Sequence, residues 1–151
     1  ITARTGLPVT HLDAVFWRPG WIEPDKEEFN ERVRRIIAQE RWIIEGGYSR
    51  TYPERATQAD LILFLDVSTP VRVLRVLRRL IQYHGRSRPD LTEGCPEKLN
   101  LSFMHWVATW RWHSRPKSLR LINDPAFSSK SVRLRSGQIP GFLDRRFSRT
   151  Q

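Results

Sequence analysis

The sequence predicts an α/β protein built on a mostly parallel sheet, and three observations support this. Short apolar runs alternate with amphipathic segments of helical spacing along the 151 residues. The run at 61–65 is continuously apolar, which is typical of a parallel strand covered on both faces. Asp13, Glu45 and Asp66 each lie at the end of such a run. Because ligands bind at the carboxyl ends of strands in open α/β sheets, we expect the functional site there.

The first half of the chain is expected to contain the end of a helix, two strands and one long helix. Residues 1–6 are expected to be the C-terminal end of a helix that terminates at Gly6. Residues 8–12 are expected to form a short strand, followed by an aromatic-rich loop. A proline and several acids then favour the start of a helix, and apolar residues recur at helical spacing over 24–41. Residues 42–45 are expected to form a buried strand.

The second half of the chain begins with a clear helix signal after the strand at 61–65. Thr69 and Pro70 are typical of the first positions of a helix, and aliphatic residues follow at helical spacing. We expect this helix to reach residue 81, followed by a loop at 84–98, helices at 101–112 and 118–122, a strand at 131–136 and a terminal helix at 138–147.

Composition places the chain among soluble globular proteins. Apolar residues make up 39% and charged residues 28%, and the length suits one domain over 1–151 with its own core. No apolar run approaches the length of a membrane span, so no membrane partner is expected. The single cysteine, Cys95, suits a reducing compartment, and we therefore expect a cytoplasmic protein.

The positive charge lies almost entirely in the second half of the chain. Residues 1–66 contain nine Lys and Arg against eleven Asp and Glu, whereas residues 67–151 contain seventeen against five. This asymmetry predicts a polyanionic partner, such as nucleotide phosphates, nucleic acid or an acidic surface. The alternative is a solvated basic face without a partner.

Three segments, taken in order, resemble a known family. They are GLPVTHLDAVFWRPGW at 6–21, RWIIEGGYSRT at 41–51 and RVLRRLIQYHGRSRPD at 75–90. Together they resemble the bacterial DNA topology modulation proteins, small members of the adenylate-kinase-like P-loop kinases, over residues 6–136. The resemblance implies a three-layer α/β/α P-loop NTPase fold and ATP-dependent phosphoryl transfer with Mg²⁺.

The segment WIIEGGYSRT supplies the first site residues that this resemblance implies. An acid at a strand end can hold Mg²⁺ through its waters, which suits Glu45. The two glycines let the backbone run close to a phosphate, and Arg50 would then bind that phosphate. The family usually has Asp in place of Glu45. The alternative is a salt bridge between Glu45 and Arg50 that pins a tight turn.

Asp13 is the second acid that the resemblance marks. In related kinases an acid at this place contacts the phosphate acceptor and helps to deprotonate its hydroxyl. The alternative is an N-cap or loop carboxylate. The neighbouring His11 is expected to be a packed core histidine, and the spacing of Cys95, His84 and His113 predicts no zinc site.

Arginines follow on the helix after the strand at 61–65. The adenylate-kinase pattern implies that Arg75, Arg78 and Arg79 bind ATP, and two of them share a helix face because they are four residues apart. The alternative is a solvated basic helix. Against it, six arginines fall between residues 72 and 88 with no acid among them.

A lid-like insertion is expected at about 83–98. The resemblance implies that Arg86 and Arg88 of this loop close over the transferring phosphoryl group and exclude water from it.

The phosphate loop of a P-loop kinase, Gly-x-x-x-x-Gly-Lys-Ser/Thr, does not occur in the sequence. In the family this loop and its strand lie just upstream of the helix that ends at Gly6. We therefore expect the native protein to be longer at its N-terminus. The missing strand would be the central one, so we also expect a gap between the strands that end at Glu45 and at Asp66.

The leading hypothesis is an ATP-dependent phosphotransferase of the nucleoside and nucleotide kinase-like group, acting on an unknown small acceptor. One alternative is a nucleic-acid-binding protein that modulates DNA topology through non-specific, salt-sensitive phosphate contacts. Another is a degenerate P-loop protein that only binds a partner. An upstream phosphate loop favours the first, and its absence favours the last.

Overall fold

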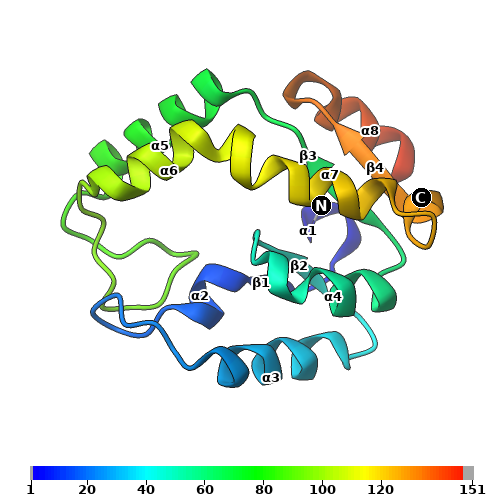
Figure 1. Cartoon of the computed structure of the whole chain (residues 1–151), viewed down its shortest axis with the longest axis horizontal. Coiled ribbons are helices and arrows are strands. Elements are labelled where there is room, and N and C mark those ends of the chain that lie inside the picture. The colour runs from blue at the N-terminus through cyan, green and yellow to red at the C-terminus, as the bar shows by residue number, and fades with distance from the viewer. Residues whose placement is uncertain (1, 148–151) are drawn as a thin grey trace.

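Four short strands form two separate parallel pairs in the computed structural model, which describes residues 2–147 (Figure 1). β1 (Val9–His11) pairs with β2 (Ile43–Glu45), and β3 (Ile62–Leu65) pairs with β4 (Ser131–Leu134). Within the described residues no strand joins the two pairs. The α/β class is confirmed, and within residues 2–147 β2 and β3 do not pair with each other. The three-layer P-loop arrangement stays a prediction.

A short helix follows β1 without a spacer, although the sequence predicts an aromatic loop there. α2 (Leu12–Phe16) buries Leu12 completely against α3 (Lys26–Ile37), whose Phe29 and Val33 complete the buried cluster. Phe16 is therefore a packing residue of this helix, and it meets the Phe29 ring edge-on at a centroid distance of 5.0 Å, whereas Trp17 and Trp21 follow the helix.

The helix α3 starts at Lys26, two residues after the expected start, and ends earlier than expected. The Asp25 carboxylate accepts hydrogen bonds from the backbone N–H groups of Glu27 and Glu28, at 2.8 and 3.3 Å, and so caps the helix. The helix ends at Ile37 rather than near Arg41, and polar and charged residues form the connection to β2.

A helix that the sequence interpretation missed connects β2 to β3. A 3₁₀ turn, η1 (Ser49–Thr51), leads directly into α4 (Tyr52–Gln58). Pro53 and Glu54 stand in its first turn, which is the usual signal of a helix start. α1 (Thr2–Thr5) lies before β1, in the region where a helix end is expected.

Helices α5 (Thr69–Tyr83) and α6 (Leu101–His113) pack side by side, and α7 (Arg115–Asn123) continues the direction of α6 past β3 (Figure 1). α7 starts three residues before its predicted start, because Pro116 occupies its first turn rather than preceding it. β4 ends at Leu134, two residues before the predicted end. The remaining elements are η2 (Ser128–Lys130), η3 (Ser136–Gln138) and α8 (Ile139–Arg146).

The loop between α5 and α6, residues 84–100, packs against the segment that follows α2. Trp21 donates from its indole N–H to the carbonyl of Pro96 at 3.0 Å, and the Thr92 hydroxyl donates to the carbonyl of Trp17 at 2.6 Å. Cys95 of the loop is fully buried. The segment predicted as a lid-like insertion is therefore a docked loop in this structure, and its role as a lid stays a prediction. Of the helices within residues 2–147, none has the length and apolar character needed to cross a bilayer.

Candidate functional site

The two acids predicted at strand ends lie at the same edge of the β1–β2 pair. His11 is opposite Glu45 in the parallel register, so both strands end at the same level. Asp13 follows in the first turn of α2. The register therefore places Asp13 and Glu45 at one carboxyl edge, as the sequence predicts.

Asp13 is held by a phenol and faced by a guanidinium. The hydroxyl of Tyr48 donates to Oδ1 of Asp13 at 2.8 Å, and Nη2 of Arg88 lies 3.8 Å from Oδ2. Burial, and next the negative charge of Asp13, raise the pKa of Tyr48, so the phenol stays protonated and remains a donor. The Asp13 carboxylate is thereby fixed in orientation while half of it stays exposed. Sequence reasoning missed Tyr48, which lies within the motif that singled out Glu45.

A buried network of charges extends from Arg88 to α5. Nε of Arg88 and Nε of Arg79 lie 2.7 and 2.9 Å from the same atom, Oε1 of Glu97. Arg88 and Glu97 are 8% and 5% exposed, and these contacts are ion pairs without good hydrogen-bond alignment. Burial, followed by the charge of Arg88, lowers the pKa of Arg79. Two predicted site residues, Arg79 and Arg88, are thus brought together by an acid that sequence reasoning did not select.

Glu45 pairs with His11 rather than with Arg50. Nδ1 of His11 lies 2.7 Å from Oε1 of Glu45, and the His11 side chain is 35% exposed. The expectation of a packed core histidine is therefore wrong, because the end of a short edge strand leaves the ring at the surface. No hydrogen bond or ion pair joins Glu45 to Arg50 within residues 2–147, and Arg50 is exposed in η1.

The turn after β2 is pinned by Arg55 instead. Its guanidinium donates to the carbonyls of Gly46 and Gly47 at 3.2 and 2.8 Å. Gly46 has φ of +133°, and a Cβ there would lie 2.8 Å from Cβ of Leu12. The first glycine of the motif therefore serves the close approach of β2 to α2.

The remaining predicted arginines lie outside this network. Arg75 and Arg78 are exposed on α5, and Arg86 is exposed in the loop at 84–100. Arg79, on the same face as Arg75 in the sequence prediction, is the one that turns inward to Glu97.

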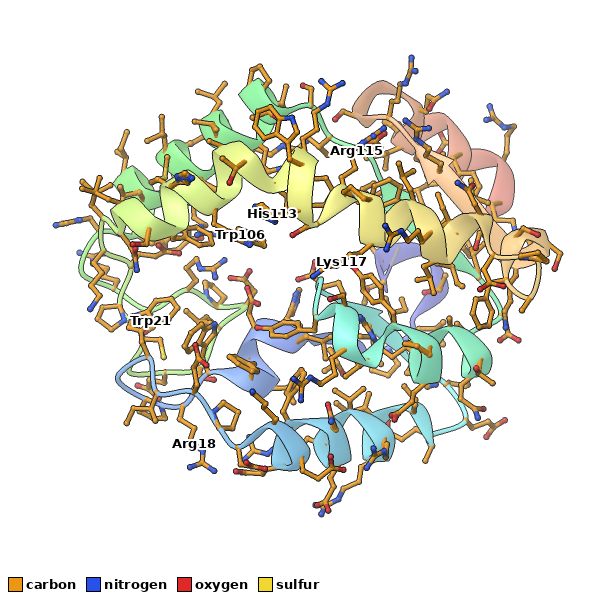
Figure 2. All side chains as sticks on the ribbon, in the orientation of Figure 1. Arg18, Trp21, Trp106, His113, Arg115 and Lys117 are labelled. Atoms are coloured by element: carbon orange, nitrogen blue, oxygen red, sulfur yellow. The ribbon has the colours of Figure 1, made fainter. Side chains whose placement is uncertain are left out.

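A second cluster lies at the carboxyl end of the β3–β4 pair. Asp66 accepts two hydrogen bonds of 2.9 Å from Arg115, which begins α7 (Figure 2), and one of 2.9 Å from Nε of Arg133. The hydrogen bond from Arg115 is the largest cause that lowers the pKa of Asp66 to about 2. Beside them Arg72 stacks over the Trp110 ring, 3.5 Å from its centroid.

Asp66, Trp110, Arg115 and Arg133 line a pocket of about 540 Å³ together with the N-terminus of α5. Arg111 and Arg135 also line it. Its arginines outnumber its single acid, Asp66, so the pocket favours anionic ligands. The sequence interpretation noted Asp66 as a strand-end acid, which was the available signal. The arginines come from α6, α7, β4 and the residue after β4, and only the fold brings them together.

No family model matches the chain, and neither a curated protein nor a solved structure shows significant similarity to it. The resemblance to DNA topology modulation proteins therefore stays a prediction from the three segments.

Proposed function

We propose that this protein is an ATP-dependent phosphotransferase of the nucleoside and nucleotide kinase-like group, acting in the cytoplasm on a small acceptor. The observation that carries the proposal is the contact between Asp13 and Arg88 at the edge of β1 and β2. Arg79 is linked to Arg88 through their shared partner, Glu97. Phosphoryl transfer needs a base or positioning acid near the acceptor hydroxyl and cations near the transferring group. This edge offers both.

Asp13 is the group proposed to receive the acceptor hydroxyl. Its carboxylate is half-exposed, and Tyr48 fixes it through Oδ1. That leaves Oδ2 facing Arg88, which would bind the phosphoryl oxygens as they approach. Arg86, exposed in the loop at 84–100, and Arg50, exposed in η1, are proposed as further phosphate ligands.

The charges of this edge favour a nucleotide that carries its own cation. Three carboxylates, those of Asp13, Asp90 and Glu97, contact the guanidiniums of Arg79 and Arg88. Acids therefore outnumber bases, and a free triphosphate would be repelled, whereas Mg²⁺–ATP brings compensating charge. Glu45 is proposed to hold that Mg²⁺ through water.

The nucleotide is proposed to extend into the pocket at β3 and β4. A volume of about 540 Å³ lies in the range of small-molecule sites, and the 15-residue helix α5 presents its positive end there. Arg75 and Arg78 are exposed on the same helix and are proposed as additional contacts. The sequence contains no phosphate loop, so the test starts from binding and not from turnover.

Calorimetry with ATP, with and without Mg²⁺, tests the proposal. We expect binding that requires Mg²⁺ and that Arg135→Ala weakens by about 10- to 100-fold, the effect of one charge-assisted hydrogen bond. Arg145→Ala, an exposed arginine near the end of α8, is the matched control and should leave affinity unchanged. Absence of binding at millimolar Mg²⁺–ATP, or equal loss in both variants, overturns the proposed site. Where binding is found, transfer of a labelled γ-phosphoryl group to nucleosides and nucleotides tests the reaction.

A second candidate function, non-specific nucleic-acid binding, is favoured by one separate observation. Trp106 and Trp112 of α6 are 46% and 72% exposed, and the neighbouring helix α5 exposes Arg75 and Arg78. Exposed aromatic rings beside arginines can stack bases and hold phosphates. Duplex and single-stranded DNA binding that falls steeply with salt, without sequence preference, supports this candidate. Unchanged affinity in a Trp112→Ala variant removes the stacking role.

A further inference from the structure

Three metal-ligating side chains from three separate segments meet beside the edge of β1 and β2. His11 comes from β1, Glu45 from β2, and Asp90 from the loop at 84–100. One ligand atom from each lies within 4.8 Å of the other two. The cluster includes an imidazole and is therefore not simply a group of surface acids.

The fold fixes the three side chains through independent contacts. The parallel register sets His11 opposite Glu45, and Nδ1 and Oε1 are already 2.7 Å apart. Asp90 is positioned by Arg88, whose Nη1 donates to Oδ2 at 2.9 Å, and a carboxylate has a second oxygen to offer. Arg88 is in turn held in the interior by Glu97.

The charges around the cluster favour a cation. Glu45 and Asp90 are acidic, and Asp13 lies across Arg88 from Asp90. Arg88 is the cation that faces the group, and it is already paired with Glu97 at 2.7 Å. A divalent ion bound here would replace the direct contact between Nδ1 of His11 and Oε1 of Glu45.

We propose that His11, Glu45 and Asp90 bind one Zn²⁺ ion, and that this ion fastens the loop at 84–100 to the edge of the β1–β2 pair. One imidazole with two carboxylates is a ligand set that suits zinc, whereas magnesium prefers oxygen ligands and several waters. Three protein ligands leave a further position for water. Glu45 is also the proposed Mg²⁺ ligand, so Zn²⁺ in this site would exclude Mg²⁺ from Glu45. The zinc site is tested without nucleotide, and its failure leaves the ATP-binding test unaffected.

Calorimetry with ZnCl₂ in the absence of nucleotide tests the site. We expect one Zn²⁺ per chain, and a loss of affinity of at least tenfold in each of His11→Gln, Glu45→Gln and Asp90→Asn. The matched controls are His84→Gln and Glu93→Gln, which change exposed residues of the same loop. Cys95→Ser is the third control and should also keep the affinity, because this buried thiol is not a ligand of the proposed site.

Hydrogen exchange of the loop supplies a second readout. Zn²⁺ should slow backbone exchange within 84–100 in the unaltered protein and leave it unchanged in Asp90→Asn. Glu45 is 59% exposed, so Glu45→Gln should fold normally. This variant keeps the test valid if His11→Gln or Asp90→Asn unfolds. Zinc affinity that survives all three ligand substitutions, or zinc binding that does not slow exchange in the loop, overturns the proposal.

Discussion

Arg88 and Glu97 form a buried ion pair within one loop, with 2.7 Å between Nε and Oε1. Arg79 contacts the same carboxylate oxygen from α5, so two guanidiniums share this acid, while Arg88 also pairs with Asp90 and Asp13. Removing one partner from a buried pair leaves an uncompensated charge in a poorly solvated place. Glu97 therefore ties the loop to α5 through Arg79.

Glu97→Gln keeps the shape of the side chain and removes its charge. We expect it to lower the free energy of unfolding by about 3 kcal/mol, because both arginines lose their shared counter-charge. Urea denaturation measures the change. Glu93→Gln, an exposed position of the same loop, should stay within about 0.5 kcal/mol of the unaltered protein. Equal stability of the two variants contradicts the structural role of Glu97.

Gly46 and Gly47 form a pair for a second test. Gly46→Ala should lower the free energy of unfolding by about 1–3 kcal/mol, because a Cβ there would lie 2.8 Å from Cβ of Leu12 at a φ of +133°. Gly47→Ala should change it by less than about 0.5 kcal/mol, since nothing lies within 4 Å of its Cβ position. Thermal or urea denaturation of both variants checks this, and a larger effect at Gly47 would refute it.

We expect the folded protein to lose stability in acid as Asp66 becomes protonated. Its folded pKa of about 2 lies below the ordinary value of 3.8, so the ionised form is stabilised by folding. The contribution is present above about pH 4 and is lost as the pH falls through 2. Asp66→Asn should cost about 1–3 kcal/mol at pH 7 and should flatten the stability profile between pH 4 and pH 2.

Urea denaturation across that range measures the effect of Asp66. Asp60→Asn, at an exposed acid before β3, is the control and should keep the acid slope of the unaltered protein. An unchanged slope in Asp66→Asn would show that Arg115 and Arg133 do not stabilise its charge in solution.

We expect the folded protein to lose stability in alkali because of Tyr48. Its pKa is raised by burial and then by Asp13, so the folded protein binds the phenol proton more tightly than the unfolded chain does. Stability is therefore intact below the ordinary tyrosine pKa of about 10 and falls as the pH rises above it. Ultraviolet titration should show one of the three tyrosines ionising late, and Tyr48→Phe should remove that step. Asp13→Asn should lower the Tyr48 pKa, and an unchanged titration in that variant contradicts the pairing.

Much of the fold could be predicted because its strands and long helices carry local signals. The apolar run at 61–65 and the Thr69-Pro70 helix start need no tertiary context. The short helices α2 and α4 could not be recognised in the same way. Helices of five and seven residues are marginal alone and form here because Leu12 and Ala56 are buried against other elements.

The candidate site was predictable to a smaller extent. Asp13 and Glu45 follow from the rule that parallel strands end at one edge. The pairing of Arg88 with Glu97 does not follow from any such rule. Glu97 lies in a loop, and its contact with Arg79 depends on how that loop docks. His11 was misjudged because its neighbour Leu12 marks the core, and the strand ends before the ring is covered.

The separation of the two strand pairs has a consequence for the order in which the chain folds. Val9 pairs with Ile43, 34 residues later, whereas Ile62 pairs with Ser131, 69 residues later. Closing a loop of twice the length costs only about 0.6 kcal/mol more in entropy. The pairing of β3 with β4, however, also requires α5, α6 and α7 to be formed and packed, because these helices lie between the two strands in the sequence. The β1–β2 pair has its own buried cluster around Leu12, and no strand within the described chain ties it to β3. The N-terminal half would therefore serve as the nucleus, and a substitution in that cluster would slow folding, whereas one in β4 would mainly speed unfolding.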